Sequence, residues 1–153
     1  YRVAERRYAR RCEGCIVLIG EANPYGGSPL NALANYPANS AGERLHNRVL
    51  ACSHNEYQTR YARHNLCIGQ WDGKEAQGRV YELITMYPSE PFVLLGAKVR
   101  KAFGLPGQDF TRVTWRDRQV VLLPHPSGLC RTWGRIDGAY AKARDLIHAL
   151  DKR

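Results

Sequence analysis

Residues 15–20 read CIVLIG, a short run of apolar and largely β-branched side chains that ends at a glycine. Such a run predicts a strand buried on both faces, as in a parallel sheet. Similar runs recur at 92–95 (FVLL) and 119–123 (QVVLL), and residues 63–68 form a further strand candidate. Stretches with helical spacing separate these runs. The alternation predicts an α/β fold, a three-layer α/β/α arrangement with a central, mostly parallel four-stranded sheet.

Capping patterns mark where two of the helices begin. Ser40 and Ser53 are each followed three residues later by a glutamate, which is the spacing of a capping box. Gly104 is expected to end the helix that runs through residues 99–103, and a last helix is expected at about 136–150. No linker interrupts the pattern, so we predict a single domain over residues 1–153.

The composition favours a polyanionic partner. Lys and Arg number 23 against 14 Asp and Glu, a net charge of +9, and 44% of the chain is hydrophobic. Nucleic acid is the leading candidate for such a partner. No apolar run approaches the roughly 20 residues that span a bilayer, and residues 1–11 lack the apolar centre of a signal peptide. We therefore expect a monomeric, cytoplasmic protein with no membrane partner.

The cysteines do not indicate a disulfide scaffold or a metal centre. They are odd in number and scattered, at positions 12, 15, 52, 67 and 130. Cys12 and Cys15 form a CxxC pair, which can belong to a zinc, iron–sulfur or redox site, but no second pair accompanies it. Reduced thiols and no bound metal are the expectation.

Two polar loops follow predicted strands and are the candidate functional segments. Residues 20–27 read GEANPYGG after the first strand, and residues 123–129 read LPHPSGL after the last. In open parallel sheets ligands bind at the carboxyl ends of the strands, which is where both loops begin. Pro124 and Pro126 flank His125, an arrangement that holds an imidazole rigidly. The first loop taken alone fits a plain turn better than a functional site, because Asn-Pro and Gly-Gly are ordinary turn dipeptides.

Together the two loops resemble the signature motifs of the uracil-DNA glycosylase superfamily, a water-activating loop after the first strand and an HPS loop after the last. Residues 41–45 (AGERL) are similar to a helix start of its thermostable branch, and residues 92–104 to its third strand and helix. The resemblance spans roughly residue 16 to the final helix. It implies the uracil-DNA glycosylase-like fold and base excision without a cofactor. That branch binds an iron–sulfur cluster through four cysteines, of which only Cys67 matches, so no cluster is expected.

The resemblance implies two catalytic roles. Asn23 matches the Asp or Asn that orients the attacking water, but the first loop carries one apparent insertion, which leaves Glu21 as the alternative. His125 matches the histidine that donates a hydrogen bond to the pyrimidine O2 as negative charge develops on the leaving base. A neutral imidazole is the form that the family implies. Neither loop contains a lysine that could form a Schiff base, so the strand is expected to stay intact.

Three further residues are implied in binding the extruded base. Asn65 matches the amide that reads its Watson–Crick edge, with one donor and one acceptor. Tyr25 corresponds to a tyrosine that excludes a 5-methyl group in the most uracil-selective branch. Tyr36 lies one position from a base-stacking phenylalanine, and core packing is an equal alternative for it.

Contacts with DNA are expected around the second loop. Leu129 matches the wedge that fills the gap left in the duplex by the extruded base. Ser127 is expected to add a neutral donor, and Arg44, Arg131 and Arg135 are the candidates for phosphate contacts.

The substrate and the reaction remain open between several possibilities. Tyr25 favours a small base such as uracil, whereas the two glycines after it favour a larger modified pyrimidine. A related branch excises hypermodified phage cytosine, including glucosylated hydroxymethylcytosine, which would make the protein antiviral and not a repair enzyme. A non-catalytic nucleic-acid-binding module on the same fold is a further alternative, because fold does not imply function. A nucleotide hydrolase is disfavoured by the lack of a GxxxxGK[ST] loop.

Overall fold

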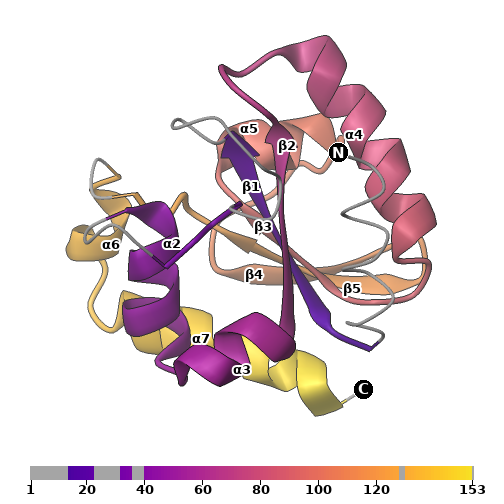
Figure 1. Ribbon diagram of the computed structural model, residues 1–153. Helices are drawn as coiled ribbons and strands as arrows, with labels where there is room; N and C mark the ends of the chain where they lie inside the picture. The colour runs from indigo at the N-terminus through magenta and orange to yellow at the C-terminus, as the bar shows by residue number, and fades with distance from the viewer. Residues whose placement is uncertain (1–13, 23–31, 36–39, 128–129, 153) are drawn as a thin grey trace.

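The computed structural model describes residues 14–22, 32–35, 40–127 and 130–152. Within these ranges the chain forms an α/β fold around a five-stranded sheet of order β2-β1-β3-β5-β4 (Figure 1). The first four strands in this order pair in parallel, and β4 pairs with β5 antiparallel. The strands are β1 (Ile16–Ala22), β2 (Tyr61–Cys67), β3 (Phe92–Leu95), β4 (Thr111–Trp115) and β5 (Arg118–Leu123). The predicted α/β class and mostly parallel sheet are confirmed.

The described sheet has one strand more than the four predicted from the sequence. The sequence indicated a last strand at 119–123, whereas residues 111–123 fold into a hairpin of β4 and β5 in which Trp115 pairs with Arg118. Arg116 and Asp117 form the two-residue connection with φ of 50° and 63°. Two central residues with positive φ are the geometry of a type I′ turn, whose twist matches that of the paired strands. The turn lacks the usual Asn-Gly sequence, so the pattern did not reveal it.

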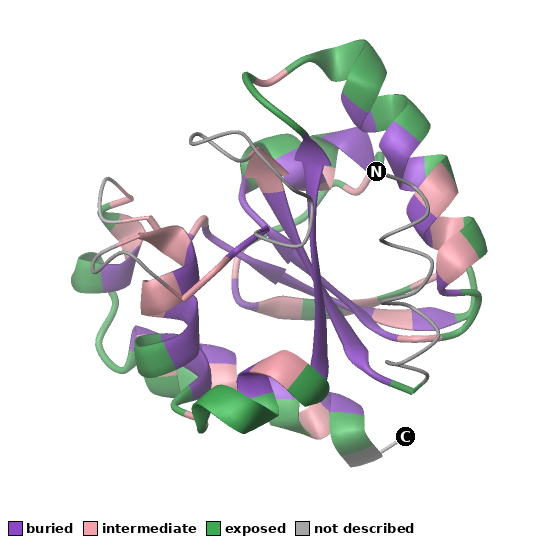
Figure 2. Cartoon of the chain, viewed as in Figure 1, coloured by how far each residue is buried: buried purple, intermediate pink, exposed green. Residues whose placement is uncertain are grey.

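Helices connect most of the strands and carry many of the exposed residues in the described ranges (Figure 2). Ser40 accepts a hydrogen bond from the Glu43 N–H, and Ser53 and Glu56 form a complete capping box, so both predicted helix starts are confirmed. None of the described helices is long and apolar enough to cross a membrane. The helices are α2 (Ala41–Arg44), the π-helix η2 (Leu45–Leu50), α3 (His54–Thr59), α4 (Gly73–Met86), α5 (Ala97–Ala102), α6 (Thr132–Arg135), α7 (Ala139–Ala149) and the 3-10 helix η3 (Leu150–Lys152).

Buried apolar side chains form a cluster on each face of the sheet. Val17 and Ile19 of β1 join a cluster with residues of α4 and α5, while Ile16 and Leu18 join one with residues of η2, α3 and α7. This division follows from the pleat, because successive side chains of a strand point to opposite faces. Burial on both faces explains why the parallel strands read as continuous apolar runs.

Candidate active site

Four adjacent parallel strands end at one edge of the sheet and carry the site. Glu21 lies on β1, Asn65 on β2, and Gly96 and His125 follow β3 and β5. Gly20 is paired with Asn65 in the register of β1 and β2. The order β2-β1-β3-β5 therefore brings together residues that are up to a hundred positions apart in the chain.

Gly96 is the point on which the side chains of Glu21 and His125 converge. A Cβ atom placed on Gly96 would lie 2.8 Å from Glu21 Oε1 and 3.3 Å from His125 Cβ. Gly96 is buried and has φ of 108°, a backbone conformation that favours glycine. The glycine that follows β3 thus leaves room for the Glu21 carboxylate and for Cβ of His125, and this carboxylate acts electrostatically on the imidazole.

Two hydrogen bonds hold the His125 loop in place. The backbone N–H of Ser127 donates to Nδ1 of His125 at 3.3 Å, and the indole N–H of Trp133 donates to the His125 carbonyl at 2.9 Å. Trp133 is itself buried and stacks on Tyr140 with ring centroids 5.1 Å apart. Because Nδ1 accepts, the proton of a neutral ring is on Nε2. The loop therefore presents an Nε2–H donor.

The surroundings of His125 favour its neutral form. Burial lowers the pKa of the imidazole, the Lys98 ammonium lowers it further, and the Glu21 carboxylate opposes both. The net direction is below the ordinary value of 6.5. At neutral pH the ring is therefore uncharged, which is the form that the resemblance implies for a hydrogen-bond donor to a leaving anion.

Asn65 supplies a buried amide on the other side of β1. Its side chain is 6% exposed, and a Cβ atom on Gly20 would lie 2.5 Å from its Oδ1. Within the described ranges no hydrogen bond involves its side-chain amide. Among the described residues, the fully buried side-chain atoms that lack a hydrogen-bond partner do not include those of Asn65, so its amide is partly open to solvent and can pair with a ligand there.

The remaining predicted residues fall into two groups. Asn23, Tyr25, Tyr36 and Leu129 lie outside the described residues. Arg131 and Arg135 are exposed at α6, whereas Arg44 is half-buried and donates from Nη2 to the Tyr140 hydroxyl at 3.1 Å. Ser127 contributes its backbone N–H to His125, as described above.

Gly96, Lys98 and Trp71 were not identified from the sequence. Lys98 lies two residues after Gly96, is exposed, and has Nζ 5.9 Å from the centroid of the Trp71 ring. Gly96 had a signal, since it ends the apolar run FVLL as Gly20 ends the run at 15–19. Lys98 had none, because a surface lysine on a helix is ordinary.

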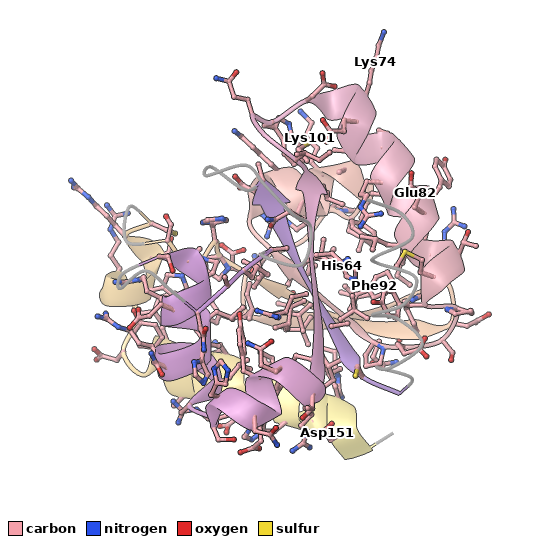
Figure 3. All side chains as sticks on the ribbon, in the orientation of Figure 1. His64, Lys74, Glu82, Phe92, Lys101 and Asp151 are labelled. Atoms are coloured by element: carbon pink, nitrogen blue, oxygen red, sulfur yellow. The ribbon has the colours of Figure 1, made fainter. Side chains whose placement is uncertain are left out.

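Lysine side chains lie at this end of the molecule. Figure 3 shows Lys74 and Lys101 at the end where β1 and β2 finish, and Asp151 at the opposite end. Lys98, whose charge acts on the His125 imidazole, is a third lysine near these polar side chains. Positive charges near a site favour the approach of a polyanion.

The chemistry available at the edge is acid–base and electrostatic. It comprises a carboxylate, a neutral Nε2–H donor and a buried amide within the described part of the chain. The described residues contain no group of three or more His, Cys, Asp or Glu that could hold a metal ion. No protein-family model matches this chain, and no curated protein matches it either.

Proposed function

We propose that this protein is a DNA glycosylase of the uracil-DNA glycosylase superfamily, with the three-layer α/β/α arrangement of that superfamily. It hydrolyses the N-glycosidic bond of a flipped-out uracil or modified pyrimidine and leaves an abasic site. One observation carries the proposal: Glu21, Asn65 and His125 all lie at the carboxyl edge of one sheet, where the side chains of Glu21 and His125 both approach Gly96. In the described residues, neither the Glu21 carboxylate nor the Asn65 amide has a hydrogen-bond partner.

His125 stabilises the leaving base. As the bond between C1′ and N1 breaks, its electron pair moves onto the base and places negative charge on O2. The Nε2–H of His125 donates to this oxygen, and it does so more strongly in the transition state than in the ground state. The Ser127 N–H on Nδ1 fixes the required tautomer.

Among the described residues, Glu21 is the candidate for the group that accepts a proton from the attacking water. The water oxygen attacks C1′ on the face opposite the leaving base, and its proton passes to the carboxylate or to solvent. A carboxylate also stabilises the positive charge that develops on the sugar. Asn23 remains the alternative that the resemblance implies, so variants of both residues belong in the test.

Asn65 recognises the base. Its amide offers one acceptor and two donors, which match the N3–H and O4 of an extruded uracil. Because this amide is buried, a base that fails to pair with it leaves a polar group unsatisfied, and this disfavours the wrong base.

DNA is the proposed partner, attracted by the net charge of +9. Arg131 and Arg135 are exposed and follow the His125 loop in the chain, which supports a role for their guanidinium groups in binding DNA phosphates. These contacts carry no sequence information, so their loss would weaken binding to all DNA alike.

An excision assay tests the proposal directly. The protein is incubated with oligonucleotides that carry uracil, 5-hydroxymethyluracil or a thymine mispair, and with glucosylated phage DNA, and the products are treated with alkali. Strand breaks at the substituted positions, formed far more slowly with His125→Ala, are the expected result. Breaks confined to phage DNA would indicate the antiviral activity. Tight DNA binding without breaks on any substrate would contradict the proposal and favour a non-catalytic binding module.

A further inference from the structure

Leu33 occupies a strained backbone conformation beside the site. Its φ is 52°, in the left-handed region that leucine rarely adopts. The Tyr57 hydroxyl donates to the Leu33 carbonyl at 2.6 Å, and Arg63 Nη1 donates to the same oxygen at 3.5 Å. The ring of Tyr57 is in turn stacked on His46, with centroids 4.7 Å apart. Strain of this kind persists only where surrounding contacts impose it.

The side chain of Leu33 lies next to the buried amide of Asn65. A Cβ atom on Gly20 would lie 3.2 Å from Leu33 Cδ2 and 2.5 Å from Asn65 Oδ1. The two side chains therefore meet over one glycine at the end of β1. Any base that reaches the Asn65 amide must be bounded on this side by the Leu33 isobutyl group.

Asn35 lies at the other end of the described segment 32–35 and also makes side-chain hydrogen bonds. Its Nδ2 donates to Nδ1 of His46 at 3.1 Å and to Nδ1 of His54 at 2.9 Å. His46 Nε2 donates to the Cys52 carbonyl at 2.8 Å, which leaves Nδ1 as the acceptor of its neutral ring. The Asn35 amide thus donates one hydrogen bond to helix η2 and one to helix α3.

We propose that Leu33 is a specificity-determining residue of the base-binding site, and that Asn35 positions it through His46 and His54. The inference rests on the proposed glycosylase function and adds a residue that limits the size of the base beside Asn65. Uracil fits against the leucine, and a bulkier pyrimidine collides with it.

The test compares single-turnover excision of uracil and of 5-hydroxymethyluracil. Leu33→Ala is expected to raise the rate ratio in favour of 5-hydroxymethyluracil by about tenfold or more, the effect of one or two methylene-sized groups in a pocket. Leu33→Gly provides a second variant that suits the positive φ and removes the side chain altogether. Leu50→Ala, an equally buried leucine of the same apolar cluster, is the matched control and should leave the ratio unchanged.

The positioning role of Asn35 has its own test. Asn35→Asp keeps the shape but replaces a donor by an acceptor, so it cannot bond to two neutral Nδ1 atoms. We expect KM to rise by about tenfold and kcat to change less. The substitution would displace Leu33, which bounds the bound base, and would leave the reacting groups in place. Asn55→Asp, exposed on α3, is the matched control.

The outcomes separate the two proposals. A wild-type protein that excises no base overturns the proposed function and this inference with it. Excision by the wild type with an unchanged base ratio in both Leu33 variants overturns the role of Leu33 alone. Equal effects of Asn35→Asp and Asn55→Asp overturn the role of Asn35.

Discussion

The backbone N–H of Ser127 lies 3.3 Å from Nδ1 of His125 and donates a hydrogen bond to it. This contact between residues two positions apart determines which nitrogen of the ring carries the proton. The HPS sequence is thus more than a turn, since the serine that follows the second proline selects the tautomer of the histidine between the prolines.

Replacing His125 by alanine is expected to reduce the excision rate by about 100- to 1,000-fold, the usual effect of removing one donor to a developing anion. DNA affinity should change little, because the phosphate contacts are made by other side chains. Single-turnover kinetics and fluorescence anisotropy measure the two quantities. Parallel loss of rate and affinity would contradict a role in the transition state.

The excision rate is expected to fall on the acid side, at a pH below 6.5. Folding lowers the pKa of His125 from the ordinary value of 6.5. The neutral ring therefore persists at pH 6.5 and becomes protonated only at lower pH. Lys98→Met removes a group that lowers this pKa, so the acid limb should move to higher pH. Lys101→Met on the same helix is the control. NMR titration of the imidazole checks the shift without an activity assay, and identical titrations of the two variants would contradict it.

Gly96→Ala is expected to reduce excision by about 100-fold, the scale of an ångström-sized misplacement of catalytic groups. The added Cβ would lie 2.8 Å from Glu21 Oε1 and would sit on a backbone with φ of 108°. The same substitution at Gly78, in α4 with open space around it, should raise stability by roughly 0.5–1 kcal/mol and leave excision unchanged. Excision rates and urea unfolding midpoints distinguish the Gly96 variant from the Gly78 variant. A fully active Gly96→Ala protein would contradict the convergence of Glu21 and His125 on Gly96.

His64 is expected to make the fold sensitive to acid. Burial lowers the pKa of this histidine to about 3 in the folded protein, against an ordinary value of 6.5. Arg79 Nη2 donates to its Nδ1 at 3.3 Å, and its Nε2 lies 2.7 Å from the Tyr87 hydroxyl. Between these pH values the unfolded chain binds the proton and the folded chain does not.

The free energy of unfolding is therefore unaffected by protonation of His64 above pH 6.5. It decreases as the pH falls from 6.5 towards 3, by at most about 1.4 kcal/mol per pH unit. Urea unfolding at several pH values measures it. His64→Gln should flatten this dependence, whereas His148→Gln on the exposed surface of α7 should retain it. A slope that survives His64→Gln would show that other groups cause it.

Local patterns predicted much of the fold because each reports a property of a short stretch of chain. The apolar runs at 15–19 and 92–95 indicated strands covered on both faces, and Ser53 with Glu56 indicated a helix start. Strand β4 was missed because its residues are only partly buried and because the Arg116–Asp117 turn reaches positive φ without glycine.

The strand-end loops and the position of His125 between two prolines were likewise visible in the residues themselves, since a strand run followed by polar residues is a local feature. Three features were not visible in this way: the approach of Glu21 and His125 to Gly96, the effect of Lys98 on that imidazole, and the approach of Leu33 and Asn65 to Gly20. They follow from the strand order β2-β1-β3-β5, which arises when separate segments bury their apolar faces together. Periodicity identifies what each segment buries, and the packing of the whole chain selects its neighbours.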